Sequence, residues 1–102
     1  MPAIPTLDDL VDDLTGFTLA RQEILGARRV RPDADERAER DEGDRTRILV
    51  IELADGRVVR AWLDEELHFG EDEEGAAWLQ PSDGSKPLRL WAPEDVRSEA
   101  GL

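Results

Sequence analysis

Cysteine, tyrosine and asparagine are all absent from the 102 residues of this chain. Without cysteine the chain cannot form disulfides, thiolate zinc sites, iron–sulfur clusters or a cysteine nucleophile. Histidine occurs once, as His68, and lysine occurs once, as Lys86, so that twelve of the thirteen basic residues are arginine. Cysteine and tyrosine are absent and histidine is single, and the abundant carboxylates show no pattern that marks a site. We therefore predict a protein that is not an enzyme and that holds no cofactor and no metal.

Long apolar runs are also missing. No stretch of about 18 apolar residues is present, so we predict no membrane span. The first six residues have neither the basic segment nor the apolar segment of a secretory signal, and we therefore expect a cytoplasmic protein. A chain of this length is enough for one small domain, 1–102, with a compact core.

Positive charge is in short supply relative to negative charge. The chain has 25 acidic residues and a formal net charge of −12. Such a surface repels nucleic-acid phosphates and anionic membranes, so we expect no direct contact with nucleic acid. The acidity favours either a partner protein with a basic surface or simple solubility in a salt-rich or GC-rich host, and the sequence does not decide between these explanations.

The clearest positive feature is a hairpin over residues 46–63. Two apolar segments flank Asp55-Gly56, and this dipeptide predicts a two-residue type I′ turn because both residues tolerate positive φ. The run Ile48–Ile51 is apolar at every position, which usually indicates burial on both faces of the strand. In a protein this short, another chain is a possible source of the second cover. The candidates for core or interface are Leu49, Ile51, Leu53, Val59, Ala61 and Trp62.

The other elements follow from spacing and turn residues. Residues 6–14 predict a short helix with one apolar stripe, capped by Thr6. We expect strands at 23–31, 46–54, 75–80 and 88–91, besides the second half of the hairpin. Residues 17–22 fit a helix or a strand. A mobile acidic loop is expected at 33–44, a helical turn at 94–97, and a frayed tail at 98–102.

These elements indicate an α+β, mainly β fold. The expected architecture is a short N-terminal helix followed by a small, bent antiparallel sheet, or a partly open barrel, of about five strands. The order of elements resembles that of Sm-like and other SH3-like barrels. No residue motif of those families is present, so the resemblance implies no function.

The sequence offers two candidate chemical sites, a pH-sensing histidine and a calcium site, and each has a simpler explanation. His68 lies among acids that favour its charged form, which would suit a pH sensor, but we favour an exposed loop histidine. Four aspartates near Gly43 offer hard oxygen ligands for calcium without the order of an EF-hand loop, and we favour diffuse counterion binding. These four are Asp33, Asp35, Asp41 and Asp44.

The tryptophans are the most valuable apolar residues. All three lie on predicted strands, and core positions are the default expectation for them. On the last strand, however, Trp91 and Arg89 alternate with Leu88 and Leu90, and an outward Trp beside an Arg is typical of an interface anchor. The candidate interface residues are Trp91, Arg89, Trp62 and Arg60.

Several arginines fall on the predicted central strands, which would place a basic patch on one face. We favour intramolecular pairing with the surrounding carboxylates over a phosphate-binding or RNA-binding patch. The arginines in question are Arg28, Arg29, Arg31, Arg45, Arg47, Arg57 and Arg60.

Three functions remain in contention at this point. The first is a small non-catalytic acidic protein-interaction module, which binds a basic protein or itself as a homodimer through its sheet. The second is a nucleic-acid-mimicking inhibitor of a basic DNA- or RNA-binding protein, with the acids at 8–13, 33–44 and 64–74 standing in for phosphates. The third and weakest is a ligand-binding or enzymatic barrel.

Overall fold

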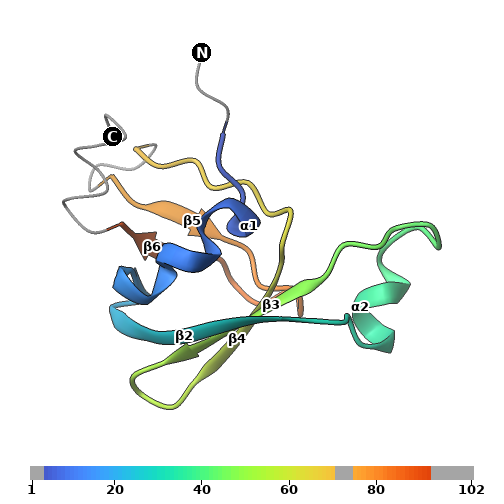
Figure 1. Ribbon diagram of the computed structural model, residues 1–102, viewed down its shortest axis with the longest axis horizontal. Helices are drawn as coiled ribbons and strands as arrows, with labels where there is room; N and C mark the ends of the chain where they lie inside the picture. The colour runs from blue at the N-terminus through green and yellow to red at the C-terminus, as the bar shows by residue number, and fades with distance from the viewer. Residues whose placement is uncertain (1–3, 71–74, 93–102) are drawn as a thin grey trace.

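The computed structural model describes residues 4–70 and 75–92 of the chain, and six strands form one antiparallel sheet in the order β4-β3-β2-β1-β6-β5 (Figure 1). The helices are α1 (Leu7–Leu10), the 3-10 helix η1 (Val11–Gly16) and α2 (Ala34–Ala38). The strands are β1 (Thr18–Leu19), β2 (Gln22–Val30), β3 (Ile48–Leu53), β4 (Val58–Trp62), β5 (Ala77–Leu79) and β6 (Leu88–Trp91). The mainly β class with a short N-terminal helix is confirmed. The sixth strand is β1, which lies in the stretch that the sequence left open.

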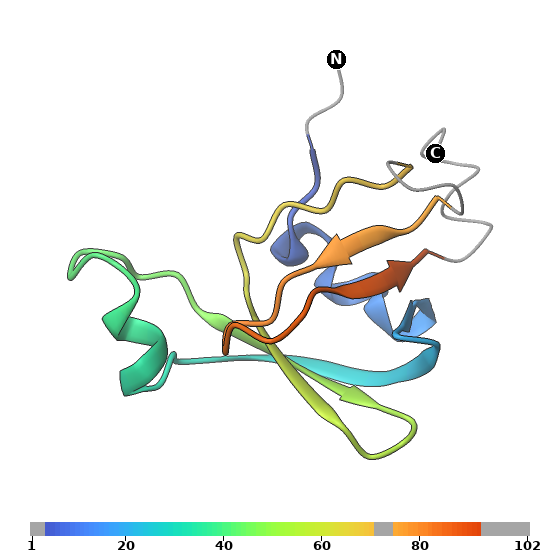
Figure 2. The ribbon, with the colours of Figure 1, turned by 180° about the vertical axis from the view of Figure 1, so that it is seen from behind.

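The sheet bends along β2, its longest strand. The first residues of β2 pair with β1, and its remaining length pairs with β3 across a β-bulge between Ile24 and Gly26. A bulge bends its strand and increases the local twist. The two halves of the sheet, β4-β3-β2 and β1-β6-β5, therefore lie at an angle to one another, as Figure 2 shows from behind.

The main core fills the inner side of this bend. Along β3, Leu49, Ile51 and Leu53 point inward and are buried. α1 and η1 add Leu7 and Leu14 from the predicted apolar stripe. Of the six hairpin residues predicted as core or interface, five are in this core: Leu49, Ile51, Leu53, Val59 and Ala61.

The hairpin at residues 46–63 is confirmed, but the predicted turn type is wrong. β3 pairs with β4 in antiparallel register, and residues 54–57 connect them; because Leu53 and Arg57 bond across the connection, its loop has three residues, 54–56. Leu53 N–H donates to the Arg57 carbonyl at 2.9 Å, and Gly56 N–H donates to the Leu53 carbonyl at 3.0 Å. Only Gly56 has positive φ there, at 90°, whereas a type I′ turn needs positive φ at both central residues. A three-residue loop with one glycine in the left-handed region also reverses the chain between the two paired strands.

Positive φ at two adjacent positions occurs instead between β1 and β2. The central residues of that two-residue loop are Ala20, with φ 51°, and Arg21, with φ 68°. Neither residue is a glycine, and an L-residue in the left-handed region carries a backbone cost of roughly 1 kcal/mol. Nothing in the local sequence predicts a turn at this place, and the paired strands impose it.

The outer face of the β4-β3-β2 half carries a second, smaller apolar cluster. Ile48, Val50 and Trp62 are buried there, on the side opposite the main core. The guanidinium of Arg40 lies over the Trp62 ring, 4.0 Å from its centroid. The predicted burial on both faces of β3 is therefore confirmed, and the chain supplies the second cover itself.

The segment expected to be a mobile acidic loop contains α2, which lies beside one end of the sheet (Figures 1 and 2). Asp33 and Glu36 form a capping box at its start, with each side chain accepting from the other residue's backbone N–H at 2.9 Å. This box explains why so polar a segment becomes helical. The mobility of 33–44 and the single-domain assignment stay predictions.

A closed barrel is not found in the described part of the chain, where β4 and β5 are the two outer strands of an open sheet. One backbone hydrogen bond connects the β5–β6 turn to β4, from Ser82 N–H to the Arg60 carbonyl at 2.8 Å. The expected helical turn at 94–97 and frayed tail at 98–102 lie outside the described residues. No helix within 4–70 and 75–92 has the length and apolarity needed to cross a membrane.

Candidate protein-interaction surface

Two tryptophans and one arginine project from the outer face of β5 and β6. Trp78 on β5 lies directly opposite Arg89 on β6, so their side chains share a face of the sheet. Trp91 follows Arg89 by two positions and therefore points to the same side. The residues between them, including Leu90, point into the main core. We call Trp78, Arg89 and Trp91 the tryptophan–arginine surface.

The arginine of this surface lies between the two indole rings. Its guanidinium carbon is 5.3 Å from the Trp78 ring centroid and 5.6 Å from the Trp91 ring centroid. Both distances are within the range of favourable cation–π contacts. Trp78 remains 47% exposed, whereas Arg89 and Trp91 are half-buried. The contacts hold large side chains in place before any partner arrives, which lowers the entropic cost of binding.

The surface adjoins an outer edge of the sheet. β5 pairs with β6 on one side, and no strand in residues 4–70 or 75–92 pairs with its other side. An edge strand offers unpaired backbone donors and acceptors, which another strand can complete. β5 thus combines an outer position in the sheet with aromatic anchors, although the Gln80 N–H just past its end already donates to Glu65.

The strained turn between β1 and β2 supports the same surface. Ala20, with its positive φ, donates its backbone N–H to the Arg89 carbonyl at 2.8 Å. Strained backbone persists only where neighbouring structure imposes it, and it is concentrated at functional sites. β1 also extends the outer face, because Trp91 pairs with Thr18 and Thr18 pairs with the exposed Glu23.

The structure divides the four predicted interface residues into two groups. Trp91 and Arg89 lie together, as the alternation along β6 predicted. Trp62 and Arg60 belong to β4 and contact other partners, so they do not contribute to the tryptophan–arginine surface. The sequence prediction missed Trp78, which we expected in the core. The signal for it was the alternation along β5, where Ala77 and Leu79 are buried and the residue between them is not.

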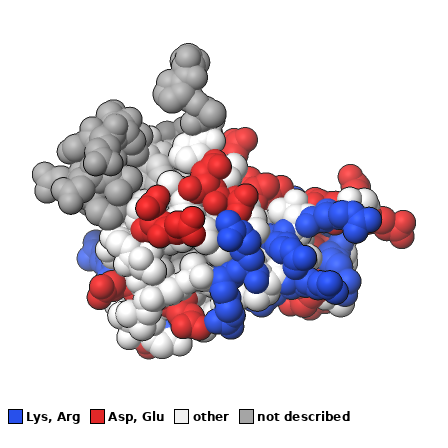
Figure 3. Space-filling view, viewed as in Figure 1, with Lys and Arg blue, Asp and Glu red and all other residues white. Residues whose placement is uncertain are grey.

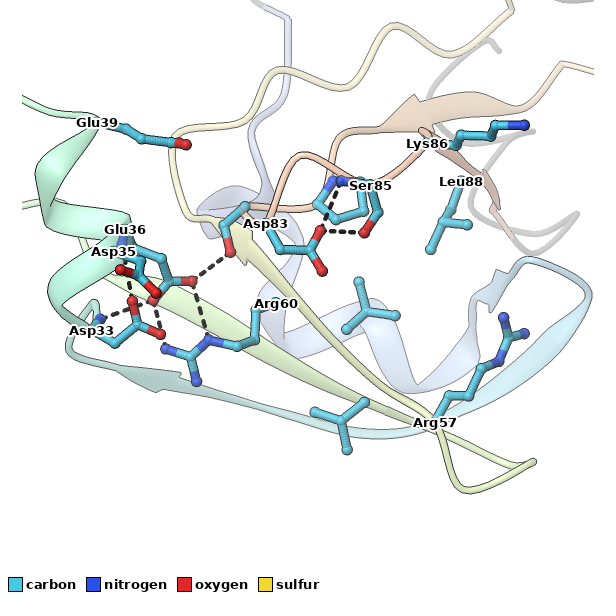
Figure 4. Close-up of a pocket in the computed structure, with 14 residues that line it drawn as sticks. Asp33, Asp35, Glu36, Glu39, Arg57, Arg60, Asp83, Ser85, Lys86 and Leu88 are labelled. Carbon is cyan, nitrogen blue, oxygen red and sulfur yellow. Dashed lines mark hydrogen bonds and ion pairs between the residues drawn. The ribbon is translucent and has the colours of Figure 1, made fainter.

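Arg60 instead belongs to a partly buried polar cluster with Glu36 and Ser82 (Figure 4). The Arg60 guanidinium donates to the two carboxylate oxygens of Glu36, at 3.1 and 2.7 Å, and the Ser82 hydroxyl donates to the same carboxylate. Glu36 is only 5% exposed. These three residues, named the Glu36 cluster, connect α2, β4 and the β5–β6 turn.

The electrostatics of the Glu36 cluster follow from these bonds. Hydrogen bonds from Arg60, and secondarily from Ser82, lower the pKa of Glu36 to about 2 against the opposing effect of burial. The same carboxylate raises the pKa of Arg60. A carboxylate with so low a pKa is a poor general base, so it cannot activate the Ser82 hydroxyl as a nucleophile. The cluster is therefore suited to holding elements together.

A hollow of about 440 Å³ lies next to the Glu36 cluster. Its walls include the acids Asp33 and Asp35 from the start of α2, and Ser85 and Asp83 from the β5–β6 turn (Figure 4). Hydrogen bonds from Ser85 lower the pKa of Asp83, so its carboxylate is ionised and already satisfied locally. The hollow presents no arrangement of nucleophile, base and orienting group.

Trp62 belongs to a second set of contacts, centred on Arg40. Besides covering the indole ring, the Arg40 guanidinium donates to Asp64 at 2.7 and 2.9 Å and to Asp44 at 3.1 Å. These bonds raise the pKa of Arg40. Hydrogen bonds from Thr46, followed by that from Arg40, lower the pKa of Asp44 to about 2. The Trp62 ring is thus covered by Arg40 of the same chain.

Neither alternative chemical site gains support from the described residues. In that part of the chain, no group of three or more His, Asp or Glu side chains is placed to hold a metal ion. Asp44, one of the four candidate calcium ligands, is bound to Arg40 instead. His68 Nε2 lies 3.4 Å from a Glu66 carboxylate oxygen, and the contact is an ion pair only when the imidazole is protonated.

The predicted pairing of the arginines holds for four of the seven. The pairs are Arg28–Glu52, Arg29–Asp8, Arg57–Asp55 and Arg60–Glu36. Arg31, Arg45 and Arg47 are exposed, and none of them forms an ion pair within the described ranges.

Comparison with protein families, curated proteins and solved structures yields no match to this chain.

Proposed function

We propose that this chain is a small non-catalytic protein-interaction module, which docks another protein on the tryptophan–arginine surface beside the edge of β5. The observation that carries the proposal is the half-exposed Trp78, held by Arg89 on β5, an outer strand of the sheet. Trp and Arg are the residues most often found to dominate binding energy at interfaces.

The expected energy is appropriate for an interface anchor. A Trp side chain buries on the order of 200 Å², so covering the exposed half of Trp78 removes roughly 100 Å² from water. At about 25 cal/mol per Å² this contributes roughly 2–3 kcal/mol. Backbone hydrogen bonds along β5 would add specificity for an extended segment of the partner.

The net charge of −12 favours a partner with a basic surface. Opposite charge steers the approach of two proteins and is screened by salt. A second copy of the chain is the other partner in this proposal, with the two β5 edges pairing about a twofold axis. We also retain the partly open SH3-like or Sm-like barrel as the description of the fold, which the single hydrogen bond between Ser82 and Arg60 supports.

The test compares the wild-type chain with Trp78→Ala and with Val58→Ala as a matched control. Val58 is an exposed apolar residue on β4, the other outer strand. The first measurement is the sedimentation mass of each protein from low to molar salt. A homodimer through β5 predicts a dimer that survives high salt in the wild type and in Val58→Ala, and a monomer in Trp78→Ala.

If all three proteins are monomers, a partner is isolated by affinity purification, and its binding to each protein is then titrated to test docking on the tryptophan–arginine surface. The proposal predicts that Trp78→Ala weakens binding at least tenfold while Val58→Ala binds like the wild type. A partner that binds Trp78→Ala normally and releases only with rising salt contradicts the proposal and supports the nucleic-acid mimic, because binding would then depend on the acidic segments alone.

A further inference from the structure

A second hollow, distinct from the tryptophan–arginine surface, lies where α1, the end of β2 and the start of β3 meet. Its volume is about 440 Å³, and three arginines and two aspartates make up the charged part of its lining. They are Arg29, Arg45, Arg47, Asp8 and Asp64. We call this site the arginine hollow.

The fold brings these arginines together from separate parts of the chain. Val30 pairs with Ile48 at the end of the β2–β3 ladder, so Arg29 and Arg47 flank that pair on neighbouring strands. Arg45 precedes Arg47 by two positions and lines the same hollow. Two backbone bonds of 3.0 Å join segments that line the hollow, from Leu63 N–H to the Arg47 carbonyl and from Asp8 N–H to the Leu63 carbonyl.

The positive charge in the hollow is not balanced. Asp8 accepts from Arg29, and Asp64 accepts from Arg40, so both acids of the hollow are already engaged. Arg45 and Arg47 form no ion pair with any residue in 4–70 or 75–92. Basic side chains gather over this end of the sheet in the space-filling view, below the acids that cover the α1 region (Figure 3). On a protein with a net charge of −12, such a place is exceptional.

We propose that Arg29, Arg45 and Arg47 form a binding site for a phosphate group, either free or carried by a small molecule. The planar, forked guanidinium group matches phosphate oxygens and donates two parallel hydrogen bonds to them. Arg29 can join the site because its bond to Asp8 is an exposed ion pair, and such pairs contribute little stability.

The surroundings favour a compact anion over a polymer. The hollow is of a size that accommodates a small ligand. Asp8 and Asp64 line its wall, and the protein as a whole is strongly acidic, so an extended nucleic acid would meet repulsion on leaving the hollow. A single phosphate group, by contrast, needs contacts only within the hollow.

Inorganic phosphate is the probe for this site, and two double variants of equal net charge are compared. Arg45→Gln/Arg47→Gln removes the unbalanced charge, and Arg21→Gln/Arg57→Gln removes two exposed arginines that do not line the hollow. Binding is followed by amide chemical shifts of the full ¹⁵N-labelled chain at constant ionic strength. We expect saturable shifts at residues 29–31 and 45–48 in the wild type and in Arg21→Gln/Arg57→Gln. In Arg45→Gln/Arg47→Gln, the affinity should fall roughly tenfold or more.

Three outcomes overturn the proposal. They are shifts that do not saturate, equal phosphate affinity in both double variants, and binding of an acidic peptide at the hollow without any response to phosphate. None of them bears on the tryptophan–arginine surface, because Trp78→Ala leaves the hollow unchanged and its interface is measured separately.

Discussion

Replacing Glu36 by glutamine removes one charge from the Glu36 cluster with little change in shape. Glutamine keeps one oxygen that can accept from the Ser82 hydroxyl, but its NH₂ group cannot accept from Asp33 N–H. The losses are therefore the counter-ion of Arg60 and one bond of the capping box. Because the cluster joins α2, β4 and the β5–β6 turn, we expect the whole domain to become less stable.

The size of the effect follows from the pKa of Glu36. Its fall from 4.5 to about 2 corresponds to roughly 3 kcal/mol at about 1.4 kcal/mol per pKa unit. The Arg60 side chain is 36% exposed, so solvent screens part of this interaction, and we expect a loss of about 1–2 kcal/mol. For a domain of this length that is roughly 5–15 °C in the melting temperature.

Glu52→Gln is the matched control, because Glu52 bonds to Arg28 in an exposed pair of the same chemistry. We expect it to cost less than about 0.5 kcal/mol. Both variants and the wild type are measured by urea unfolding at neutral pH and at several acidic pH values.

The pH dependence has a definite sign. A folded-state pKa below the unfolded value stabilises the protein fully above pH 4.5, and this stabilisation is lost as the pH falls towards about 2. The difference between wild type and Glu36→Gln should therefore shrink over that range. Equal losses in Glu36→Gln and Glu52→Gln, or a difference that stays constant down to pH 2, would refute the reasoning.

Three further variants, with Gly26→Ala as a control, test the backbone and the second apolar cluster by thermal or urea unfolding. Ala20→Gly relieves a positive φ and should stabilise by about 0.5–1 kcal/mol, and a destabilised variant would contradict the strain. Gly56→Ala should destabilise by at least 1 kcal/mol because φ is 90° there, whereas Gly26→Ala, where a Cβ meets nothing within 4 Å, should have little effect; equal losses would argue against the loop geometry. Arg40→Gln should cost about 1–2 kcal/mol of stability. It should also shift the tryptophan fluorescence maximum to longer wavelength, because Trp62 becomes more exposed to water; an unchanged spectrum would show that Arg40 does not cover the ring.

How much of the fold could be predicted depended on whether the determining contacts were local. The hairpin at 46–63 followed from two apolar segments and one glycine, and it is present. Its turn type did not follow, because Asp55-Gly56 suits a three-residue loop as well as a two-residue one. The turn at Ala20-Arg21 has no turn residues at all, since pairing of β1 with both β2 and β6 holds it.

The residues that cover the second apolar face of β3 likewise could not be predicted, because they are distant in the sequence. The apolar run Ile48–Ile51 predicted burial on both sides, but not which segment provides it. The segment 33–44 has no large apolar residue, so its sequence did not point to a contact with the sheet. Part of it forms α2 behind the capping box of Asp33 and Glu36, and Arg40 contacts Trp62, a residue 22 positions away in the sequence.

The candidate surface was predictable only in part. Alternation along β6 identified Arg89 and Trp91 correctly as an outward pair. The same rule applied to β5 would have added Trp78, but three residues are too short a strand to show the alternation convincingly. The pairing of arginines was predictable in kind from the abundance of acids. It was not predictable residue by residue, because Arg45 and Arg47 lie as close in sequence to acids as the arginines that do pair.

The most direct test of the central proposal follows the three indole N–H signals of the full chain by NMR as partner or self-association is titrated. Trp62 is only 8% exposed and lies under Arg40, so it serves as an internal control. Docking on the tryptophan–arginine surface predicts that the signals of Trp78 and Trp91 shift together while that of Trp62 stays in place. Binding that leaves the Trp78 signal unmoved would contradict the proposal.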